Sequence, residues 1–160
     1  MTVTDKDMGW KALGERVESM SDGSAYVLVG IQGSEGDAEH RDDGLTNVQL
    51  GTIHEFGLGV PRRSFIRDAI DQYQKELADT AFTLGRRVLL GEADPHGPIS
   101  EAYALQLLGQ EAVRIIQQRI TAHIPPPLSE ITKKRKGSDV PLVQYGTLRR
   151  SITYKLGGTA

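Results

Sequence analysis

Two long runs of the sequence repeat apolar residues at steps of three and four, the spacing that places side chains on one face of a helix. The first run begins after Ser64, a residue type that favours helix N-caps, and continues to about Leu90. The second begins near Ser100 and ends before the prolines at positions 125–127, which cannot continue a helix. Two such amphipathic helices need an apolar surface to cover. The apolar positions of the first are Ile66, Ile70, Tyr73, Leu77, Ala81, Leu84 and Val88.

That surface is expected from two segments rich in β-forming residues. Residues 25–31 are a short, dense run typical of a buried strand, and residues 152–156 alternate apolar and polar side chains. A short helix is expected between Thr46 and Gly57, because Thr46 and Gln49 have the spacing of a capping box and glycine commonly ends helices. The sequence therefore predicts an α+β fold, in which a small antiparallel sheet is packed by two long helices plus short helices, with extended loops.

The chain has 160 residues, and we expect residues 1–160 to form a single domain. Residues 1–23 are expected to form an N-terminal helical arm anchored by Trp10. Residues 34–45 combine acidic residues and glycines with little apolar material, so we expect an acidic loop there. Residues 129–141 are polar and basic, and we expect them to form a basic loop.

The composition argues against several classes of protein. The formal net charge is -2, which gives no overall attraction to nucleic acid or to an anionic membrane. The chain contains no cysteine, which excludes disulfides and zinc–thiolate sites and suits a reducing cytoplasm. The longest apolar runs are too short to span a bilayer, and the N-terminus lacks the apolar core of a signal peptide. We therefore expect no membrane partner.

No enzyme motif is complete. A zinc-protease helix needs a second histidine four residues after His54, but that position is Leu58. The segment Gly-Ser-Glu-Gly at positions 33–36 lacks the residues that a nucleophile elbow or a phosphate loop requires. No pair of carboxylates stands in apolar surroundings, as glycosidase chemistry would need. We therefore predict no enzymatic activity, no cofactor and no metal. The lesser alternative is a dispersed metal site built from His40, His96 and His123.

The one concentrated run of charge is basic. Lys133, Lys134, Arg135 and Lys136 stand together and are candidates for DNA-facing or intersubunit charge. A solvated loop without a binding function is favoured over a DNA-facing segment, because no aromatic residues alternate with the cations to stack on bases.

The most specific pattern is Ile-His-Glu-Phe-Gly at positions 53–57, followed by Val-Pro-Arg-Arg-Ser-Phe-Ile-Arg-Asp-Ala at positions 60–69. A second pattern begins with Pro-Pro-Leu-Ser at positions 126–129 and ends with Tyr-Gly-Thr-Leu-Arg-Arg-Ser-Ile at positions 145–152. In this order, the two patterns resemble the signature of the phage tail-completion proteins, which join head to tail in long-tailed bacteriophages. The resemblance covers about residues 48–156.

The chain departs from the family pattern in two places. The family usually has proline at the position of Ser64, and an acidic residue followed by threonine at the positions of Gln144 and Tyr145. Each motif residue can serve the fold itself or contact a partner. The candidates carried by the resemblance are His54, Glu55, Phe56, Gly57, Pro61, Arg63, Phe65, Arg67, Pro127, Leu128, Gly146, Leu148 and Arg149.

The resemblance implies a structural virion protein of the phage neck, assembled in the cytoplasm of a bacterial host. Such a protein would form a sixfold or twelvefold homo-oligomeric ring with head-to-tail contacts. Its partners would be neighbouring neck, connector and tail-terminator or tail-tube proteins, with genomic DNA in the lumen as a further candidate. The acidic and basic loops could meet across subunits. Two alternatives stay open: a tail terminator that caps the tail tube, and, from a different class, a nucleic-acid-binding module that uses the basic loop.

Overall fold

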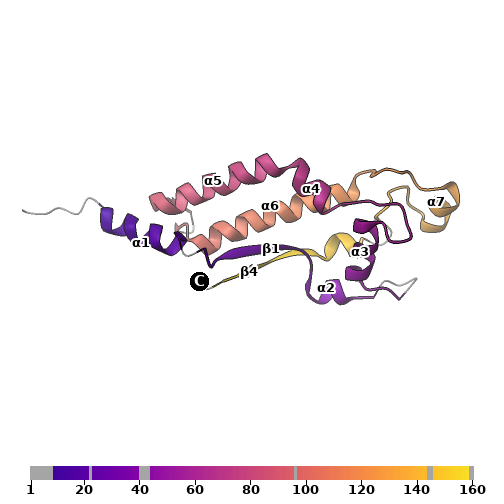
Figure 1. The fold of residues 1–160 in the computed structure, drawn as a ribbon, viewed down its shortest axis with the longest axis horizontal. Coiled ribbons are helices and arrows are strands. Elements are labelled where there is room, and N and C mark those ends of the chain that lie inside the picture. Colours follow the sequence, from indigo (N-terminus) through magenta and orange to yellow (C-terminus); the bar gives the residue numbers. More distant parts are fainter. Residues whose placement is uncertain (1–8, 22, 40–43, 96, 144–145, 159–160) are drawn as a thin grey trace, which may run out of the picture.

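The computed structural model of the chain describes residues 9–21, 23–39, 44–95, 97–143 and 146–158. Helices predominate in this part of the chain and the strands are few and short, which confirms the α+β class (Figure 1). In chain order, the elements are α1 (Trp10–Ser21), β1 (Tyr26–Ile31), α2 (Gly33–Asp37), α3 (Asn47–Phe56), α4 (Arg67–Gln72), α5 (Gln74–Leu90), β2 (Ala93–Asp94), β3 (Gly97–Pro98), α6 (Glu101–Thr121), α7 (Glu130–Lys136), α8 (Thr147–Arg150) and β4 (Ile152–Gly157).

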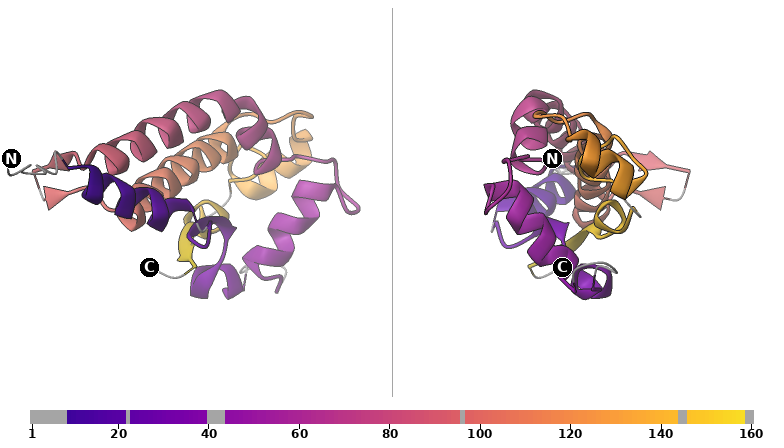
Figure 2. Two further views of the ribbon diagram at one scale, coloured as in Figure 1. Left: turned by 60° about the vertical axis from the view of Figure 1, so that its left-hand side comes forward. Right: turned by 90° about the vertical axis from the view of Figure 1, so that its right-hand side faces the viewer.

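Three layers stack through the middle of the elongated molecule: the sheet of β1 and β4, then α6, then α5 (Figures 1 and 2). The two strands pair antiparallel, with Tyr26 opposite Gly157 and Ile31 opposite Ile152. A sheet of two strands is only about 10 Å wide, which matches the diameter of one helix. The two long helices therefore pack in series, with α6 on the sheet and α5 on α6.

The main core lies between α6 and the sheet and reaches the segment before α4. Gly109 marks the place where α6 comes closest to the strands, because a Cβ atom there would lie 2.8 Å from Cγ2 of Val27 and 2.9 Å from the ring of Tyr154. Only glycine permits so close an approach without a shift of the helix or of the ring. The completely buried apolar side chains of this core are Phe65, Ala69, Ile115, Ile116 and Ile120.

The short helix α3 and the long helix α6 begin as the sequence predicts. Oγ1 of Thr46 accepts a hydrogen bond from the Gln49 N–H at 3.2 Å, and Oε1 of Gln49 accepts one from the Thr46 N–H at 3.0 Å. Helix α3 ends at Gly57, which has a φ of 73°. At the start of α6, Oγ of Ser100 accepts a hydrogen bond from the Tyr103 N–H at 3.1 Å. These caps satisfy N–H groups that have no partner within the helix.

The prediction of a single helix over residues 64–90 is wrong, because two helices, α4 and α5, occupy this range. Ser64 is not the helix N-cap; its hydroxyl donates to the Glu55 carboxylate at 2.6 Å, and α4 begins at Arg67. The helices separate at Tyr73, where φ is -107° and ψ is 16°. The apolar stripe continues through this break, so the periodicity alone could not reveal it.

Both segments expected to be loops contain a helix, which corrects the prediction. Within residues 34–45, α2 packs Gly36 into a buried position, while residues 40–43 lie outside the described part of the chain. Within residues 129–141, α7 is capped by Ser129, whose Oγ accepts a hydrogen bond from the Thr132 N–H at 3.2 Å. The basic side chains of this segment therefore project from a helix.

The described part of the expected N-terminal arm is helix α1; residues 1–8 and 22 lie outside the description. Trp10 does not anchor the arm, because its side chain is 75 % exposed. The arm is held at its other end, where Met20 packs on a small cluster between α5 and α6 and Nη1 of Arg16 donates to the Leu89 carbonyl at 3.0 Å.

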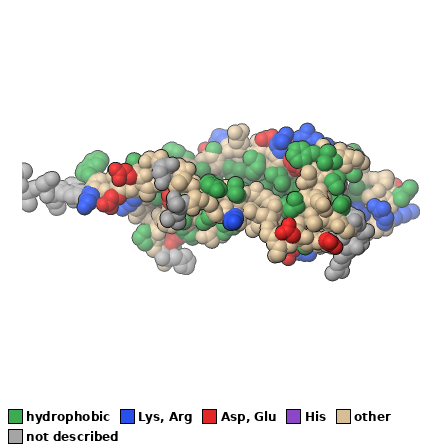
Figure 3. All heavy atoms as spheres, turned by 60° about the horizontal axis from the view of Figure 1, so that its bottom comes forward, with side chains coloured by type: hydrophobic (Ala, Val, Ile, Leu, Met, Phe, Trp, Pro, Cys, Tyr) green, Lys and Arg blue, Asp and Glu red, His purple; other side chains and the backbone are tan. Residues whose placement is uncertain are grey.

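The outer face of the sheet retains apolar side chains at the surface. Tyr26 and Leu28 of β1 are exposed there. Figure 3 shows this side of the molecule, with hydrophobic side chains along its middle and Lys and Arg side chains at the end formed by α7.

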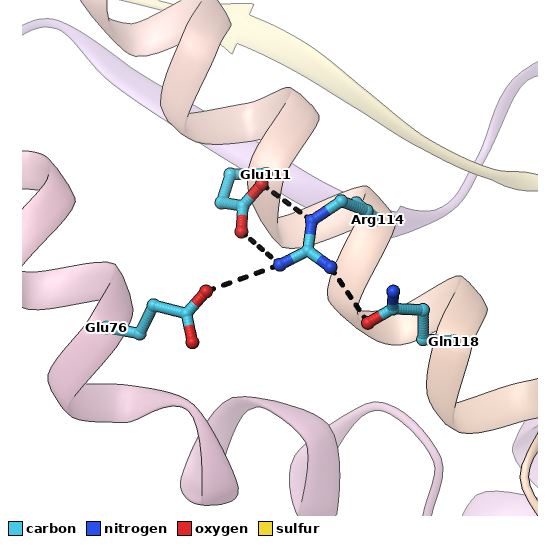
Figure 4. Close-up of polar contacts among 4 residues, drawn as sticks. All are labelled: Glu76, Glu111, Arg114 and Gln118. Carbon is cyan, nitrogen blue, oxygen red and sulfur yellow. Dashed lines mark hydrogen bonds and ion pairs between the residues drawn. The ribbon is translucent and has the colours of Figure 1, made fainter.

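On the surface, Arg114 of α6 connects the two long helices (Figure 4). Its Nε donates to Oε2 of Glu111 at 2.8 Å, its Nη1 to Oε1 of Gln118 at 2.9 Å, and its Nη2 to Oε1 of Glu76 on α5 at 3.3 Å. The hydrogen bond from Arg114 lowers the pKa of Glu111, and the same bond raises the pKa of Arg114. Because the groups lie at the surface, the network adds little to stability.

Candidate functional site

The two parts of the first motif are joined by the carboxylate of Glu55, which is only 9 % exposed. Its Oε1 accepts hydrogen bonds from Oγ of Ser64 at 2.6 Å and from the Arg67 N–H at 3.0 Å. Its Oε2 accepts from the N–H groups of Phe65 at 2.8 Å and Ile66 at 2.9 Å. These N–H groups belong to the start of α4, where an anion is favoured by the helix dipole. Glu55 therefore caps a helix that begins twelve residues later in the chain.

The other residues of the first motif shape the same turn. A Cβ atom at Gly57 would lie 2.8 Å from Cβ of Arg62, and the positive φ also requires glycine. Phe65 is completely buried in the main core, whereas Phe56 is exposed. Arg67 contributes its N–H to Glu55 while its side chain stays exposed. Most of this motif therefore serves to build the connection between α3 and α4.

Arg63 joins the first motif to the second. Its side chain is 4 % exposed, and its Nη2 donates to the carbonyl of Pro126 at 2.6 Å. Its Nη1 donates to the carbonyl of Pro61 at 3.5 Å, and its backbone N–H to the carbonyl of His54 at 2.8 Å. Leu148 of the second motif is buried in the same core as the first. Two patterns that lie far apart in the sequence thus form one structural unit.

This unit surrounds a pocket of about 710 Å³ that is lined by residues of α3, α7 and α8. Helices α3 and α7 lie toward the same end of the molecule (Figure 1). The apolar walls of the pocket come from α3, from the turn after it and from the chain on both sides of α7, and include Leu50, Leu58 and Leu142. The candidate motif residues that line it are His54, Pro61, Arg63, Pro127, Leu128, Gly146 and Leu148.

The charged side chains that line the pocket are all cationic. Arg63, Arg135 and Lys136 line it, and none of its described lining residues carries a carboxylate. Burial, followed by the positive charges of Arg63 and Lys136, lowers the pKa of His54 to about 4, so the imidazole is neutral at pH 7. Burial and the charges of Arg63 and Arg135 also lower the pKa of Lys136. Among the described residues that line the pocket, no carboxylate balances this positive charge.

Two nitrogen atoms beside the pocket lack hydrogen-bond partners in the described part of the chain: Nδ1 of His54 and Nε of Arg63. Both are buried, and a buried donor or acceptor without a partner costs about 1–3 kcal/mol. Buried nitrogen atoms without a partner therefore stand beside the charges of the pocket.

The structure divides the four cations that stand together in the sequence, because successive side chains on a helix point about 100° apart. Lys133 pairs with Glu130 at 2.7 Å, and this hydrogen bond raises the pKa of Lys133. Lys136 turns inward, where its Nζ donates to two backbone carbonyls of the following turn at 3.4 and 2.5 Å. Lys134 and Arg135 remain exposed, and only Arg135 of these two lines the pocket. The run therefore does not form one uniform charged surface.

The remaining candidates do not reach the pocket. Arg149 is exposed, and its backbone carbonyl accepts a hydrogen bond from Nε2 of Gln117 at 3.1 Å. Gln144 and Tyr145, the departures in the second motif, lie outside the described residues. The candidates that do not line the pocket are Glu55, Phe56, Gly57, Phe65, Arg67, Lys133, Lys134 and Arg149.

No group of three or more His, Asp or Glu side chains in the described residues is placed to hold a metal ion. Of the histidines outside the first motif, His40 and His96 lie outside the description and His123 is exposed. Among the helices of the described chain, none has the length and apolar character needed to cross a membrane. Comparisons with family models, with curated proteins and with solved structures found no match.

Proposed function

We propose that this chain is a structural protein of the neck of a long-tailed bacteriophage, in which copies of it form a ring that completes the tail and connects it to the head. The motif resemblance supports the family, and the arrangement of those motifs supports a shared structural unit. The observation that supports assembly into a ring is the exposure of large apolar side chains at both ends of an elongated subunit.

The two ends present different apolar side chains. Trp10 on α1 is 75 % exposed and Ile131 on α7 is 82 % exposed, and α1 and α7 lie at opposite ends of the molecule (Figure 1). Complete burial of a large apolar side chain is worth about 1.5–3 kcal/mol, so each end gains stability from a partner. Two unlike surfaces at opposite ends favour a head-to-tail contact between copies, and such contacts generate rings when the rotation closes.

The oligomer is tested by sedimentation and negative-stain electron microscopy of the purified chain. We expect a closed ring for the natural protein. Trp10→Ser and Ile131→Ser should each give monomers, because each change removes one side of every contact. Lys75→Ser, a change at an exposed polar position, is the control and should leave the ring intact.

Mixing the two interface variants gives a sharper result. An equimolar mixture of Trp10→Ser and Ile131→Ser should form dimers that go no further, because each variant keeps the side that the other has lost. A mixture that remains monomeric, or a natural protein that is monomeric at high concentration, would contradict head-to-tail assembly.

The location in the virion is tested by gold labelling of an epitope-tagged chain in assembled particles. We expect label at the junction of head and tail. Label along the tail tube, or particles without label, would count against the neck. Salt-dependent binding of the isolated chain to DNA, with affinity falling steeply as salt increases, would instead support the nucleic-acid-binding alternative.

A further inference from the structure

The pocket between α3, α7 and α8 combines positive charge with an aliphatic wall, and neither belongs to the proposed ring contacts at Trp10 and Ile131. Arg63, Arg135 and Lys136 line it without a carboxylate among the described lining residues, and aliphatic side chains form much of its wall. Arg63 is 4 % exposed and its Nε has no hydrogen-bond partner among the described residues. A buried guanidinium without a balancing anion is costly unless a ligand supplies the anion.

The aliphatic wall decides what kind of anion fits. Leu58 stands between the two parts of the first motif and Leu128 in the second motif, and both line the pocket together with the cations. A volume of about 710 Å³ lies within the range of ligand pockets, which is about 300–1,000 Å³. A bare inorganic anion would leave most of this wall exposed to water. A chain segment that carries a carboxylate beside aliphatic side chains would cover the wall and balance the charge.

We propose that this pocket binds an extended segment of another polypeptide chain, with an acidic side chain facing Arg63, Arg135 and Lys136 and aliphatic neighbours against the apolar wall. The exposed Arg135 is suited to this role, because a planar guanidinium pairs with a carboxylate through two parallel hydrogen bonds. Such binding requires neither a ring nor a virion.

The depressed pKa of His54 offers a readout inside the pocket. The charges of Arg63 and Lys136 contribute to lowering this pKa to about 4. A carboxylate bound beside those cations opposes their effect, so the pKa of His54 is higher when an acidic segment is bound than when an uncharged segment of the same shape is bound. A contact elsewhere on the surface leaves the pKa of His54 unchanged.

The test is a titration of the full ¹⁵N-labelled chain with acetyl-Leu-Asp-Leu-amide, followed by nuclear magnetic resonance. We expect saturable shifts of amide resonances around the pocket and a His54 pKa that is higher in this complex than in the complex with acetyl-Leu-Asn-Leu-amide. Acetyl-Leu-Asn-Leu-amide, which lacks only the charge, should bind about tenfold more weakly, the factor expected for loss of one charge-assisted hydrogen bond. Inorganic phosphate alone should bind more weakly than the aspartate peptide.

The matched variants are Arg135→Ala and Lys134→Ala, which remove adjacent exposed cations from the same helix. Arg135→Ala should weaken binding of the aspartate peptide about tenfold, because Arg135 lines the pocket. Lys134→Ala should leave it unchanged. Neither residue is buried, so both variants should fold, and the dispersion of the spectra confirms this directly. The proposal is overturned if the two peptides bind equally, if phosphate binds as tightly as the peptide, or if the two variants behave alike.

Discussion

Glutamine in place of Glu55 removes the charge that caps α4 while keeping nearly the same shape. The carboxylate accepts hydrogen bonds through both oxygens, but an amide has only one acceptor oxygen. If the amide nitrogen faces Ser64, the hydroxyl can turn and accept, and the Arg67 N–H loses its partner. If it faces the other way, the N–H groups of Phe65 and Ile66 lose theirs. Either orientation leaves at least one buried donor unpaired.

The cost follows from these lost bonds. A hydrogen bond to a charged group is worth about 1.5–3 kcal/mol, and a buried unpaired N–H costs about 1–3 kcal/mol. Because the two terms overlap, we expect Glu55→Gln to lower the free energy of unfolding by about 2–4 kcal/mol. The carboxylate is nearly inaccessible, so water cannot replace the lost partner.

The assay is urea denaturation followed by far-ultraviolet circular dichroism. The control is Glu76→Gln, the same chemical change at an exposed helical carboxylate that makes one contact of 3.3 Å to Arg114. The control should leave the denaturation midpoint within error. Amide hydrogen exchange adds a local readout, because Glu55→Gln should accelerate exchange at residues 65–67. Equal midpoints for the two variants, with unchanged exchange, would refute the capping role.

Three further predictions concern the core and the pocket. The pKa of His54 is about 4 in the folded chain and 6.5 for an unperturbed histidine, so the unfolded chain binds the proton more tightly than the folded chain. The free energy of unfolding should therefore fall by about 1–2 kcal/mol between pH 7 and pH 5. His54→Gln should remove that decrease in urea denaturation. Gly109→Ala should be about 1–3 kcal/mol less stable than Gly85→Ala in urea denaturation. Both substitutions raise helix propensity. At Gly109 the new Cβ would lie within 3 Å of side chains on the strands, whereas at Gly85 the nearest atom, Cε of Met20, would be 3.7 Å away. Phe65→Ala should cost about 3–5 kcal/mol by the same assay, whereas Phe56→Ala, at an exposed position, should cost little.

The parts of the fold that the sequence predicted correctly depend on neighbours within a few residues. The capping box of Thr46 and Gln49 and the cap at Ser100 involve side chains and N–H groups three residues apart. The helix end at Gly57 depends on the backbone freedom of one glycine. Such contacts are visible in the sequence because the chain does not need to fold back on itself to make them.

The break between α4 and α5 was missed for a related reason. The Tyr73 N–H bonds to the Ala69 carbonyl at 3.1 Å and the Leu77 N–H to the Tyr73 carbonyl at 3.0 Å, so helical spacing is kept on both sides of the break. The apolar stripe therefore reads as continuous. The helix α7 was missed because its basic residues suggested a solvated loop, although Ser129 and Gly137 supplied a start and a stop.

The pocket could not be predicted from local patterns. It depends on the hydrogen bond from Arg63 to the Pro126 carbonyl, which joins residues 63 positions apart, and on the inward turn of Lys136. The sequence did identify residues of both motifs as candidate site residues, because the family resemblance includes both motifs. It did not show that they meet, nor that Arg63 is buried rather than presented to a partner.

The pairing of β1 with β4 has a consequence for folding during synthesis. Gln32, next to β1, bonds to the Thr153 carbonyl of β4 across 121 positions of the chain. The ribosome must therefore release nearly all of the described chain before the sheet can form. Until then the apolar side of α6 has no strands to cover it, and the nascent chain exposes Ile115, Ile116 and Ile120. The slowest and most aggregation-prone interval of folding therefore lasts until β4 has left the ribosome and pairs with β1.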